Sequence, residues 1–373
     1  MKIGIDAKWY FEGPPSGKRV VRGLVDALLA TDRKNEYYIF LNRKHSNEVF
    51  PVANAGNVRL VYVWAGNNML SNVFVLPGYV SRFKLDVVLY QNFISVFGAG
   101  RNIAYIHDVL FLSNPEYYTI YERLYFAPLK FLTRRADCVI TVSEEEKKRL
   151  IHFAFASDAK KIHVAYHGVD TTFQPRDSYE SKVVEEVKAM YALPDRFLLY
   201  VGRLNLRKNV DNLLRAIFLL RDKNIPLVIV GSSNWKESDH MRTIKELGIE
   251  HRVIFTGSVF QSLGVVYALS TLFCFPSNAE SFGLPPLEAM ACGVPVVVAN
   301  TTSLPEVCGE AGNYVSPNRP DEIAAMIDSL LGNEQLYREK SALGLAQSKK
   351  FTWDRAAQRV IEVIELCVTH PAE

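Results

Sequence analysis

The chain has 373 residues, of which 49% are hydrophobic and 22% are charged, and its formal net charge is +3 at neutral pH. This balance excludes a disordered or fibrous protein, and the length is sufficient for two domains with separate hydrophobic cores. Five cysteines without C-x-x-C spacing argue against a disulfide framework or a zinc site, and with no signal peptide before the first strand we expect a cytoplasmic protein.

Short apolar runs alternate with helical patterns along the first half of the chain. His107 ends one of these runs, so we expect it in a loop at the carboxyl edge of a sheet. The loop after the first run, residues 13–19, reads Gly-Pro-Pro-Ser-Gly-Lys-Arg, and Gly17 is the position where its backbone can approach a ligand. The predicted strands cover residues 2–6, 37–41, 58–63, 85–90, 103–107, 138–142 and 162–165.

The second half repeats the alternation after a polar, charge-rich stretch, residues 174–188, which we predict to be the linker. Residues 253–276 contain no charge and are long enough to span a membrane, but their polar residues favour two buried strands around a short helix. Alternation of this kind predicts parallel sheets, and the strands are too numerous for one sheet. The strands predicted here lie near 197–201, 226–230, 253–256, 272–275 and 295–299.

Two segments of the second half carry the residues of a predicted anion site. Residues 280–288 read Glu-Ser-Phe-Gly-Leu-Pro-Pro-Leu-Glu, which predicts a helix start with a carboxylate on each side. Amides at a helix start lie at its positive end and bind phosphate, whereas Glu288, one turn further in, suits the hydroxyls of a ribose. The donor-binding candidates of this segment are Ser281, Phe282, Gly283, Leu284 and Glu288.

The other segment follows the apolar run 197–201, which is typical of a buried parallel strand. Arg203 and Lys208 leave the carboxyl end of this strand, where open α/β sheets bind ligands, and two cations there can neutralise a diphosphate. Phosphate donors together with a hydroxyl acceptor predict a nucleotide-sugar site. The simpler alternative is an ordinary strand-turn-helix unit with a solvated Glu at each end.

In order and spacing, these segments resemble the retaining, nucleotide-sugar-dependent glycosyltransferases of family 4. The resemblance covers nearly the whole chain and implies the GT-B fold, an α/β architecture of two Rossmann-like, doubly wound parallel-sheet domains facing across a cleft. Residues 1–173 would bind the acceptor, residues 174–351 would bind the nucleotide sugar, and the last helix, 352–373, would return to the first domain. The matching segments are 105–108, 167–170, 202–209, 280–288 and 289–297.

Site roles follow from the resemblance. Glu280 would lie near the hydroxyls of the transferred sugar, His107 would contact the same sugar, and Glu288 would bind the ribose. Front-face attack by the acceptor hydroxyl needs no carboxylate nucleophile, and we expect neither a metal nor a cofactor besides the nucleotide sugar. The catalytic candidates are His107, Arg203, Lys208 and Glu280.

The segment 282–288 resembles bacterial mannosyl- and rhamnosyltransferases of polysaccharide assembly, so GDP-mannose is the first expected donor and a glycan or lipid-linked glycan is the expected acceptor. Residues 116–135 mix aromatic and basic side chains, as in a helix that contacts the inner face of a membrane peripherally; the alternative, which the pattern favours, is a helix of the first domain whose aromatics belong to the core. No nucleic-acid reader motif is present. Two alternative functions remain open, a nucleotide-sugar 2-epimerase of the same fold and a non-catalytic sugar-nucleotide-binding protein.

Overall fold

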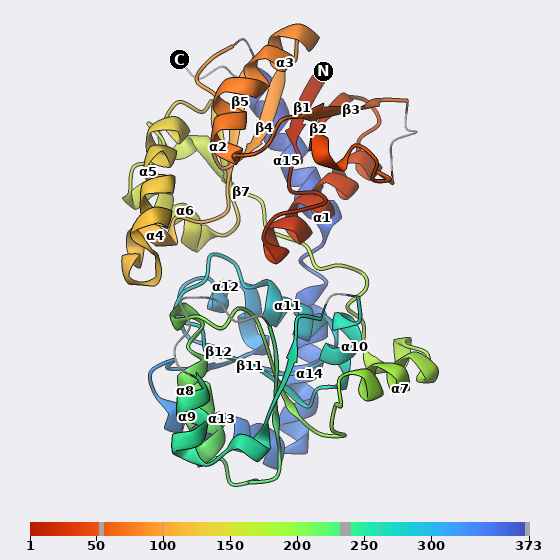
Figure 1. The fold of residues 1–373 in the computed structure, drawn as a ribbon, viewed down its shortest axis with the longest axis vertical. Helices are drawn as coiled ribbons and strands as arrows, with labels where there is room; N and C mark the ends of the chain where they lie inside the picture. Colours follow the sequence, from red (N-terminus) through yellow and green to blue (C-terminus); the bar gives the residue numbers. More distant parts are fainter. Residues whose placement is uncertain (52–55, 99, 232–239, 260, 370–373) are drawn as a thin grey trace. The chain divides into compact units, whose positions relative to one another are not determined.

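The chain divides into two compact units, which Figure 1 colours along the sequence. The computed structural model describes residues 1–51, 56–98, 100–231, 240–259 and 261–369. Unit 1 comprises residues 1–168 and 351–373, and unit 2 comprises residues 169–350. Each unit contains one parallel β-sheet connected by helices.

The sheet of unit 1 has seven parallel strands in the order β3-β2-β1-β4-β5-β6-β7. The strand β4 reads Val-Val-Leu-Tyr-Gln and is buried at every position, as expected for a parallel strand covered on both faces. The strands span Lys2–Asp6 (β1), Glu36–Asn42 (β2), Val58–Val63 (β3), Val87–Gln91 (β4), Arg101–Ile106 (β5), Cys138–Thr141 (β6) and Ile162–Val164 (β7).

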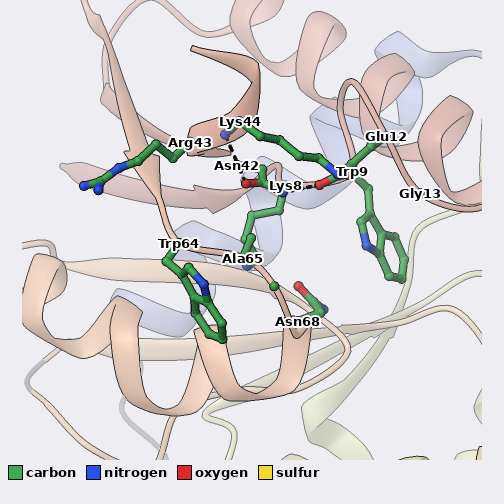
Figure 2. A pocket seen from close by; sticks show the side chains of 11 residues that line it. Lys8, Trp9, Glu12, Gly13, Asn42, Arg43, Lys44, Trp64, Ala65 and Asn68 are labelled. Atoms are coloured by element: carbon green, nitrogen blue, oxygen red, sulfur yellow. Dashed lines mark hydrogen bonds and ion pairs between the residues drawn. The ribbon is translucent and has the colours of Figure 1, made fainter.

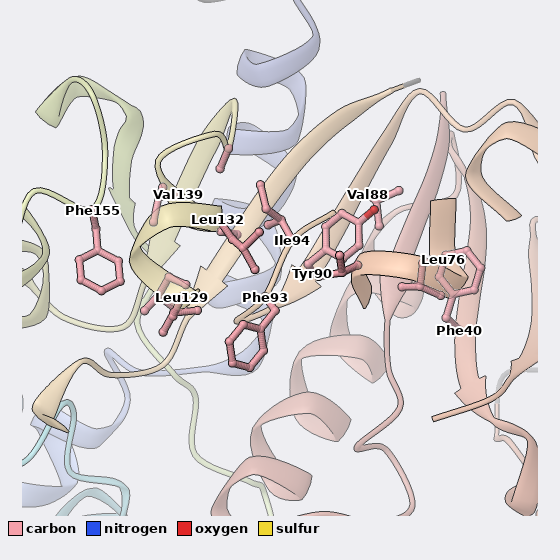
Figure 3. Packing of buried hydrophobic residues seen from close by; sticks show 14 of the residues in the cluster. Phe40, Leu76, Val88, Tyr90, Phe93, Ile94, Leu129, Leu132, Val139 and Phe155 are labelled. Carbon is pink, nitrogen blue, oxygen red and sulfur yellow. The ribbon is translucent and has the colours of Figure 1, made fainter. Parts of the chain in front are cut away.

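Helices cover both faces of this sheet. On one face, a buried cluster joins residues of the sheet to residues of α3, α5 and α6; in Figure 3, Phe40 lies beside Leu76 of α3 and Phe93 lies near Leu129 of α5. The helices of unit 1 are α1 (Pro15–Thr31), α2 (Asn68–Leu70), α3 (Leu76–Phe83), α4 (Leu110–Ser113), α5 (Ile120–Thr133), α6 (Glu144–His152) and α15 (Trp353–Thr369). Short 3₁₀ or π turns cover Arg43–His45, Ser71–Val75, Pro115–Tyr117 and Ala159–Lys161.

The last helix, α15, packs along α1 and contacts β5 and β6 of unit 1. Thr352 caps it, because its hydroxyl accepts a hydrogen bond from the Arg355 amide at 3.2 Å. Trp353 begins the helix beside two glycines. A Cβ atom on Gly23 would lie 2.3 Å from the Trp353 ring, and one on Gly168 would lie 2.2 Å from the Trp353 amide nitrogen. Both glycines are therefore needed for α15 to reach its position.

The sheet of unit 2 has six parallel strands in the order β10-β9-β8-β11-β12-β13. Its strands are β8 (Leu198–Val201), β9 (Leu227–Val230), β10 (Val253–Gly257), β11 (Leu272–Phe275), β12 (Val296–Ala299) and β13 (Gly312–Val315). Its helices are α7 (Ser181–Met190), α8 (Val210–Leu219), α9 (His240–Leu247), α10 (Leu263–Leu269), α11 (Leu284–Ala291), α12 (Leu304–Cys308), α13 (Pro320–Gly332) and α14 (Glu334–Ser348). Additional 3₁₀ turns cover Arg176–Ser178, Leu206–Lys208, Glu250–Arg252 and Gly309–Ala311.

Three local expectations differ from the structure. Residues 13–19 are not a loop throughout, because Pro15 begins α1 and places Gly17 inside its first turn. Most of the predicted linker, 174–188, lies in the 3₁₀ turn Arg176–Ser178 and in α7, where Val184 and Val187 are buried on one side of the helix. The short strand β13 was not predicted. The charge-free window 253–276 does form two strands around a helix, as expected.

Both sheets change direction at one internal point. In unit 1 the chain runs outward from β1 to β3 and then resumes on the other side of β1 at β4. In unit 2 it does the same between β8 and β11. Ligands of open α/β sheets bind at the carboxyl ends of the strands at such switch points, so each unit has one place where a site is expected.

Candidate active site

The loop after β8 carries the two predicted phosphate-binding cations of unit 2. Arg203 is exposed, and its carbonyl accepts a hydrogen bond from the Tyr200 hydroxyl at 2.9 Å. Lys208 is buried at the end of a 3₁₀ turn, and its amide donates to the Asn205 side chain at 3.2 Å. The structure therefore places Arg203 in solvent and Lys208 inside the unit.

Glu280, which follows β11, lies against this loop although it is distant in the sequence. Lys208 Nζ donates to Glu280 Oε1 at 2.5 Å, and Arg207 Nη1 lies 3.1 Å from Glu280 Oε2. The buried Ser277 hydroxyl also donates to Glu280 Oε1, at 2.5 Å. Each carboxylate oxygen thus faces a cation at the switch point between β8 and β11.

This arrangement shifts the pKa values of the charged groups. Burial by itself would raise the pKa of Glu280, but the charges of Arg207 and Lys208, with hydrogen bonds from Lys208 and Ser277, outweigh burial and lower it. Burial lowers the pKa of Lys208, and the Glu280 charge opposes that shift. The Lys208 ammonium also lies 4.6 Å from the centre of the Phe275 ring. Glu280 is accordingly ionised at neutral pH.

The backbone around Glu280 is held by the segment that follows β12. The Glu280 amide donates to Thr302 Oγ1 at 2.9 Å. The buried Ser303 hydroxyl donates to the carbonyls of Glu280 and Phe282, at 3.1 and 2.7 Å. These bonds fix the chain where it leaves β11 and turns toward α11.

The helix α11 begins where the sequence predicts. Gly283 precedes it with φ of 121°, a backbone conformation that favours glycine. Because Pro285 and Pro286 have no N–H group, the first amides of the helix belong to Gly283 and Leu284. Phe282 and Leu284 are buried and Ser281 is half-buried. Glu288 lies one turn inside the helix and is 1% exposed, so it is not the solvated end residue of the simpler alternative.

In unit 1, His107 follows β5 and is partly buried. Its Nε2 lies 2.7 Å from Gln91 Oε1 at the end of β4. The rings of Tyr105 and His167 lie 5.0 and 6.1 Å from the His107 ring, centre to centre. Burial lowers the pKa of His107 to about 4, although the Asp6 charge raises it in part. His107 is therefore neutral at neutral pH.

A buried polar cluster lies beside His107 at the switch point of unit 1. Lys8 Nζ contacts Asp6 Oδ1 and Asn72 Oδ1, each at 2.5 Å. Asn72 Nδ2 donates to Asp6 Oδ2 at 2.9 Å, and the backbone amide of Gln91 donates to the same oxygen at 3.3 Å. Each polar side chain of the cluster is at least 97% buried. The lysine charge is thus balanced by a carboxylate two residues away.

Gly17 packs on an aromatic side chain. A Cβ atom at this position would lie 3.2 Å from the Trp9 ring, a tight contact. The small residue therefore makes room for Trp9, and the predicted approach of a diphosphate to Gly17 stays a prediction.

Of the predicted residues, the structure brings Lys208 and Glu280 into contact. His107 and Gly17 both belong to unit 1. Sequence reasoning missed Arg207, Ser277, Thr302 and Ser303. Arg207 had a signal, since it is a third cation between Arg203 and Lys208. Nothing in the sequence pattern marks the three hydroxyl residues. Thr302 and Ser303 reach the Glu280 segment from the loop after β12, and Ser277 bonds Glu280 within an irregular segment that has no periodic pattern.

Comparison with known proteins connects this geometry to a family. Residues 17–173 match the family described as Glycosyltransferase Family 4, and residues 184–343 match Glycosyl transferases group 1. The chain is 32% identical over 272 residues to O-antigen chain mannosyltransferase B of Escherichia coli, with 71% of this chain and 70% of that protein covered. The chain belongs to glycosyltransferase family 4.

Another relative of this family 4 glycosyltransferase is much longer than the segment that matches it. Serotype-specific mannosyltransferase WbdA of Escherichia coli is 31% identical over 271 residues, which cover 70% of this chain but 33% of WbdA. The chain thus spans about a third of the length of that relative.

Solved structures show the fold of this glycosyltransferase. Sucrose-phosphate synthase of Thermosynechococcus elongatus superimposes with a TM-score of 0.76 at 20% identity, covering 98% of both chains. Anabaena HepE, solved with UDP-glucose, gives 0.73 at 19% identity, covering 98% of this chain and 99% of HepE. Two parallel-sheet α/β units with such neighbours are the GT-B fold, which confirms the predicted fold class.

The described residues contain neither a membrane-spanning helix nor a clustered metal site. No helix there is long and apolar enough to cross a bilayer. Within the same residues, His, Cys, Asp and Glu form no group of three or more that could hold a metal ion. Metal-independent transfer stays a prediction, because only an activity measurement can test it.

Proposed function

We propose that this chain is a retaining hexosyltransferase that takes mannose from GDP-mannose and adds it to a glycan or a lipid-linked glycan. The observation that carries the proposal is the buried Lys208–Glu280 pair at the switch point of unit 2, in a chain 32% identical to an O-antigen chain mannosyltransferase. The names of WbdA and of O-antigen chain mannosyltransferase B support mannose as the transferred sugar.

The chemistry of the leaving group explains the cations. Breaking the sugar–phosphate bond leaves negative charge on the diphosphate, and Arg203, Lys208 and the start of α11 would stabilise it. A helix dipole contributes only about 0.3–2 kcal/mol, whereas enzymes lower barriers by about 8–23 kcal/mol. The dipole must therefore act together with the cations and with precise placement of the substrate.

Two further groups would act on the transferred sugar. Glu280 is ionised and held on both oxygens, so it can accept hydrogen bonds from sugar hydroxyls only in a fixed direction. His107 is neutral, so it can exchange hydrogen bonds with a sugar without adding a positive charge beside the cation-like sugar of the transition state. Glu288 would bind the ribose from within α11.

The helix α5 supports a peripheral membrane location for the acceptor reaction. Tyr125 and Phe126 of this helix pack against the core, as the alternative to membrane contact expected. Tyr121 and Phe131, however, are 81% and 57% exposed. They share α5 and its C-terminal end with the basic residues Arg123, Lys130, Arg134 and Arg135. Exposed aromatics with basic residues bind anionic lipid, so co-flotation with phosphatidylglycerol vesicles should be lost when Tyr121 and Phe131 are replaced by Ser.

A panel of nucleotide sugars tests the donor. Binding to the native state raises the melting temperature by mass action, so GDP-mannose should stabilise the protein more than UDP-glucose, UDP-galactose or dTDP-rhamnose. With a mannose-containing acceptor, GDP should be released and the glycan extended. If only another nucleotide sugar stabilised the protein, its sugar would replace mannose in the proposal. Interconversion of the nucleotide sugar without an acceptor would favour the 2-epimerase. Binding without transfer or hydrolysis would favour the non-catalytic alternative.

A further inference from the structure

A pocket of about 650 Å³ opens in unit 1 at the carboxyl ends of β1, β2 and β3. Its volume lies within the range of small-molecule sites, about 300–1,000 Å³. The loops after these strands contribute Trp9, Glu12, Lys44, Trp64 and Asn68.

Two indole rings form the apolar walls of the pocket. Figure 2 shows Trp9 and Trp64 on opposite sides of the pocket, with Lys8 between them. Trp9 is held by glycines, because a Cβ atom on Gly13 or Gly17 would come within 3.0 or 3.2 Å of its ring. Trp64 is 52% exposed, so part of a large aromatic side chain is accessible to a ligand.

The charged groups of the pocket are largely balanced within the chain. Glu12 contacts the Lys44 ammonium and the Asn42 amide, and Lys8 contacts Asp6. Arg43 also lines the pocket, but Figure 2 shows its side chain extending away from the space between the indoles. Balanced charges provide hydrogen-bonding groups for hydroxyls while offering little to a phosphate.

Asn68 adds another polar group. Its Nδ2 donates to the Gln91 carbonyl at 3.3 Å, which leaves the carboxamide oriented beside the pocket. Aromatic faces together with carboxylate and amide groups match a pyranose ring, whose C–H face is apolar and whose edge carries hydroxyls. A ligand without such an edge would leave these polar groups desolvated and unmatched.

The pocket lies beside His107 of the same unit. The Trp9 ring lies 6.1 Å from the His107 ring, centre to centre, and Gln91 contacts both Asn68 and His107. A sugar seated on Trp9 would therefore lie beside the histidine proposed to contact the transferred sugar.

We propose that this pocket binds a neutral sugar ring of the acceptor, seated between Trp9 and Trp64, with its hydroxyls on Glu12 and Asn68. The inference rests on the proposed glycosyl transfer and makes it more specific, since the acceptor would present an uncharged pyranose here. The phosphate of a lipid-linked acceptor would lie outside the pocket.

Titration of the intact protein with sugars tests the pocket directly. The probes are mannotriose and the corresponding neutral oligosaccharides of glucose, galactose and rhamnose, with mannose 6-phosphate and inorganic phosphate as charged probes. We expect a neutral oligosaccharide to bind, Trp64→Ala to raise its Kd about tenfold, and Trp64→Phe to retain most of the affinity. The matched control is Phe74→Ala, because Phe74 is 65% exposed in the same unit and does not line the pocket.

The same variants separate this inference from the proposed function. Trp64→Ala should raise the KM for the acceptor about tenfold while leaving the Kd of the nucleoside diphosphate unchanged. Transfer with an acceptor KM unaltered in Trp64→Ala would overturn the pocket assignment and leave the transferase proposal intact. Binding of phosphate or sugar phosphate alone, or of no neutral sugar in the panel, would also overturn it. Sugar binding without transfer from any donor would instead contradict the proposed function.

Discussion

The switch points of the two units have the same topology but different charge. In unit 1 the buried cluster pairs Lys8 with Asp6, two residues away, and the adjacent His107 is neutral. In unit 2 a single carboxylate, Glu280, faces both Arg207 and Lys208, with Arg203 nearby in solvent. The excess of positive charge in unit 2 suits a diphosphate, whereas the balanced cluster of unit 1 suits hydroxyl groups. The same topology therefore positions two chemically different sets of side chains at its switch points.

The largest effect should come from the cations that distinguish unit 2. Lys208→Ala should lower kcat/KM by about 10²–10³-fold, the usual loss when one preorganised electrostatic group is removed. Arg203→Ala should act in the same direction, and its exposure makes it the variant that spares the fold. Both should also weaken nucleoside-diphosphate binding, measured by calorimetry. If nucleoside-diphosphate affinity and transfer rate were unchanged in both variants, the positive charge of unit 2 would not explain donor binding.

Lowering the pH should destabilise unit 1 through protonation of His107. Because burial lowers the pKa of His107 to about 4 from 6.5, the unfolded chain binds this proton first, and stability is lost as the pH falls from 6.5 toward 4. Solvent access at the partly exposed ring limits the loss to roughly 2 kcal/mol. The lowered pKa of Glu280 reduces the stability of unit 2 only when the pH falls below 4.5, the ordinary pKa of this carboxyl group.

Hydrogen exchange at pH 7, 5.5 and 4.5 measures this effect. Burial raises the pKa of Glu146 in the same unit to about 8, which acts in the opposite sense, so the comparison is between the wild type and His107→Gln. The variant should lose less protection of its unit 1 amides than the wild type as the pH falls. An unchanged pH dependence in His107→Gln would contradict the assignment of His107 as an acid-sensitive group.

The two glutamates of unit 2 should have separate effects. Glu288→Gln should raise the Kd of the free nucleoside diphosphate about tenfold, because a carboxylate makes stronger hydrogen bonds to ribose hydroxyls than an amide does. Glu280→Gln should leave that Kd nearly unchanged and lower turnover. Equal losses of nucleotide binding in both variants, or a complex with Glu288 far from the ribose, would refute this division.

The smallest effect should follow removal of divalent ions. Since Arg203 and Lys208 can neutralise the diphosphate, excess chelator should change kcat by less than about twofold. Activity that disappears with chelator and returns with Mg²⁺ or Mn²⁺ would show that the cations of unit 2 are not sufficient.

Strand positions were predictable because both sheets are parallel and covered on both faces. The central strands of such sheets are largely apolar, as β4 and β11 are, and helices must connect them. The start of α11 was also local information, carried by Gly283 and the two prolines after it. The failures lie at segments whose state depends on packing, such as α7, where a polar composition conceals two buried valines.

The sequence by itself determined the fold class, the family and the residues Arg203, Lys208, Glu280 and Glu288 as candidates, because strand periodicity, helix-start chemistry and motif spacing are local. Tertiary structure alone decided which of them meet. Lys208 and Glu280 are 72 residues apart in the sequence. They meet because β8 and β11 are parallel neighbours, which places the carboxyl ends of the two strands side by side. The pairing of Arg207 with Glu280, the bonds of Thr302 and Ser303 to the Glu280 segment, and the pocket between Trp9 and Trp64 have the same origin. Each combines loops from different strands, and such combinations leave no periodic signal along the chain.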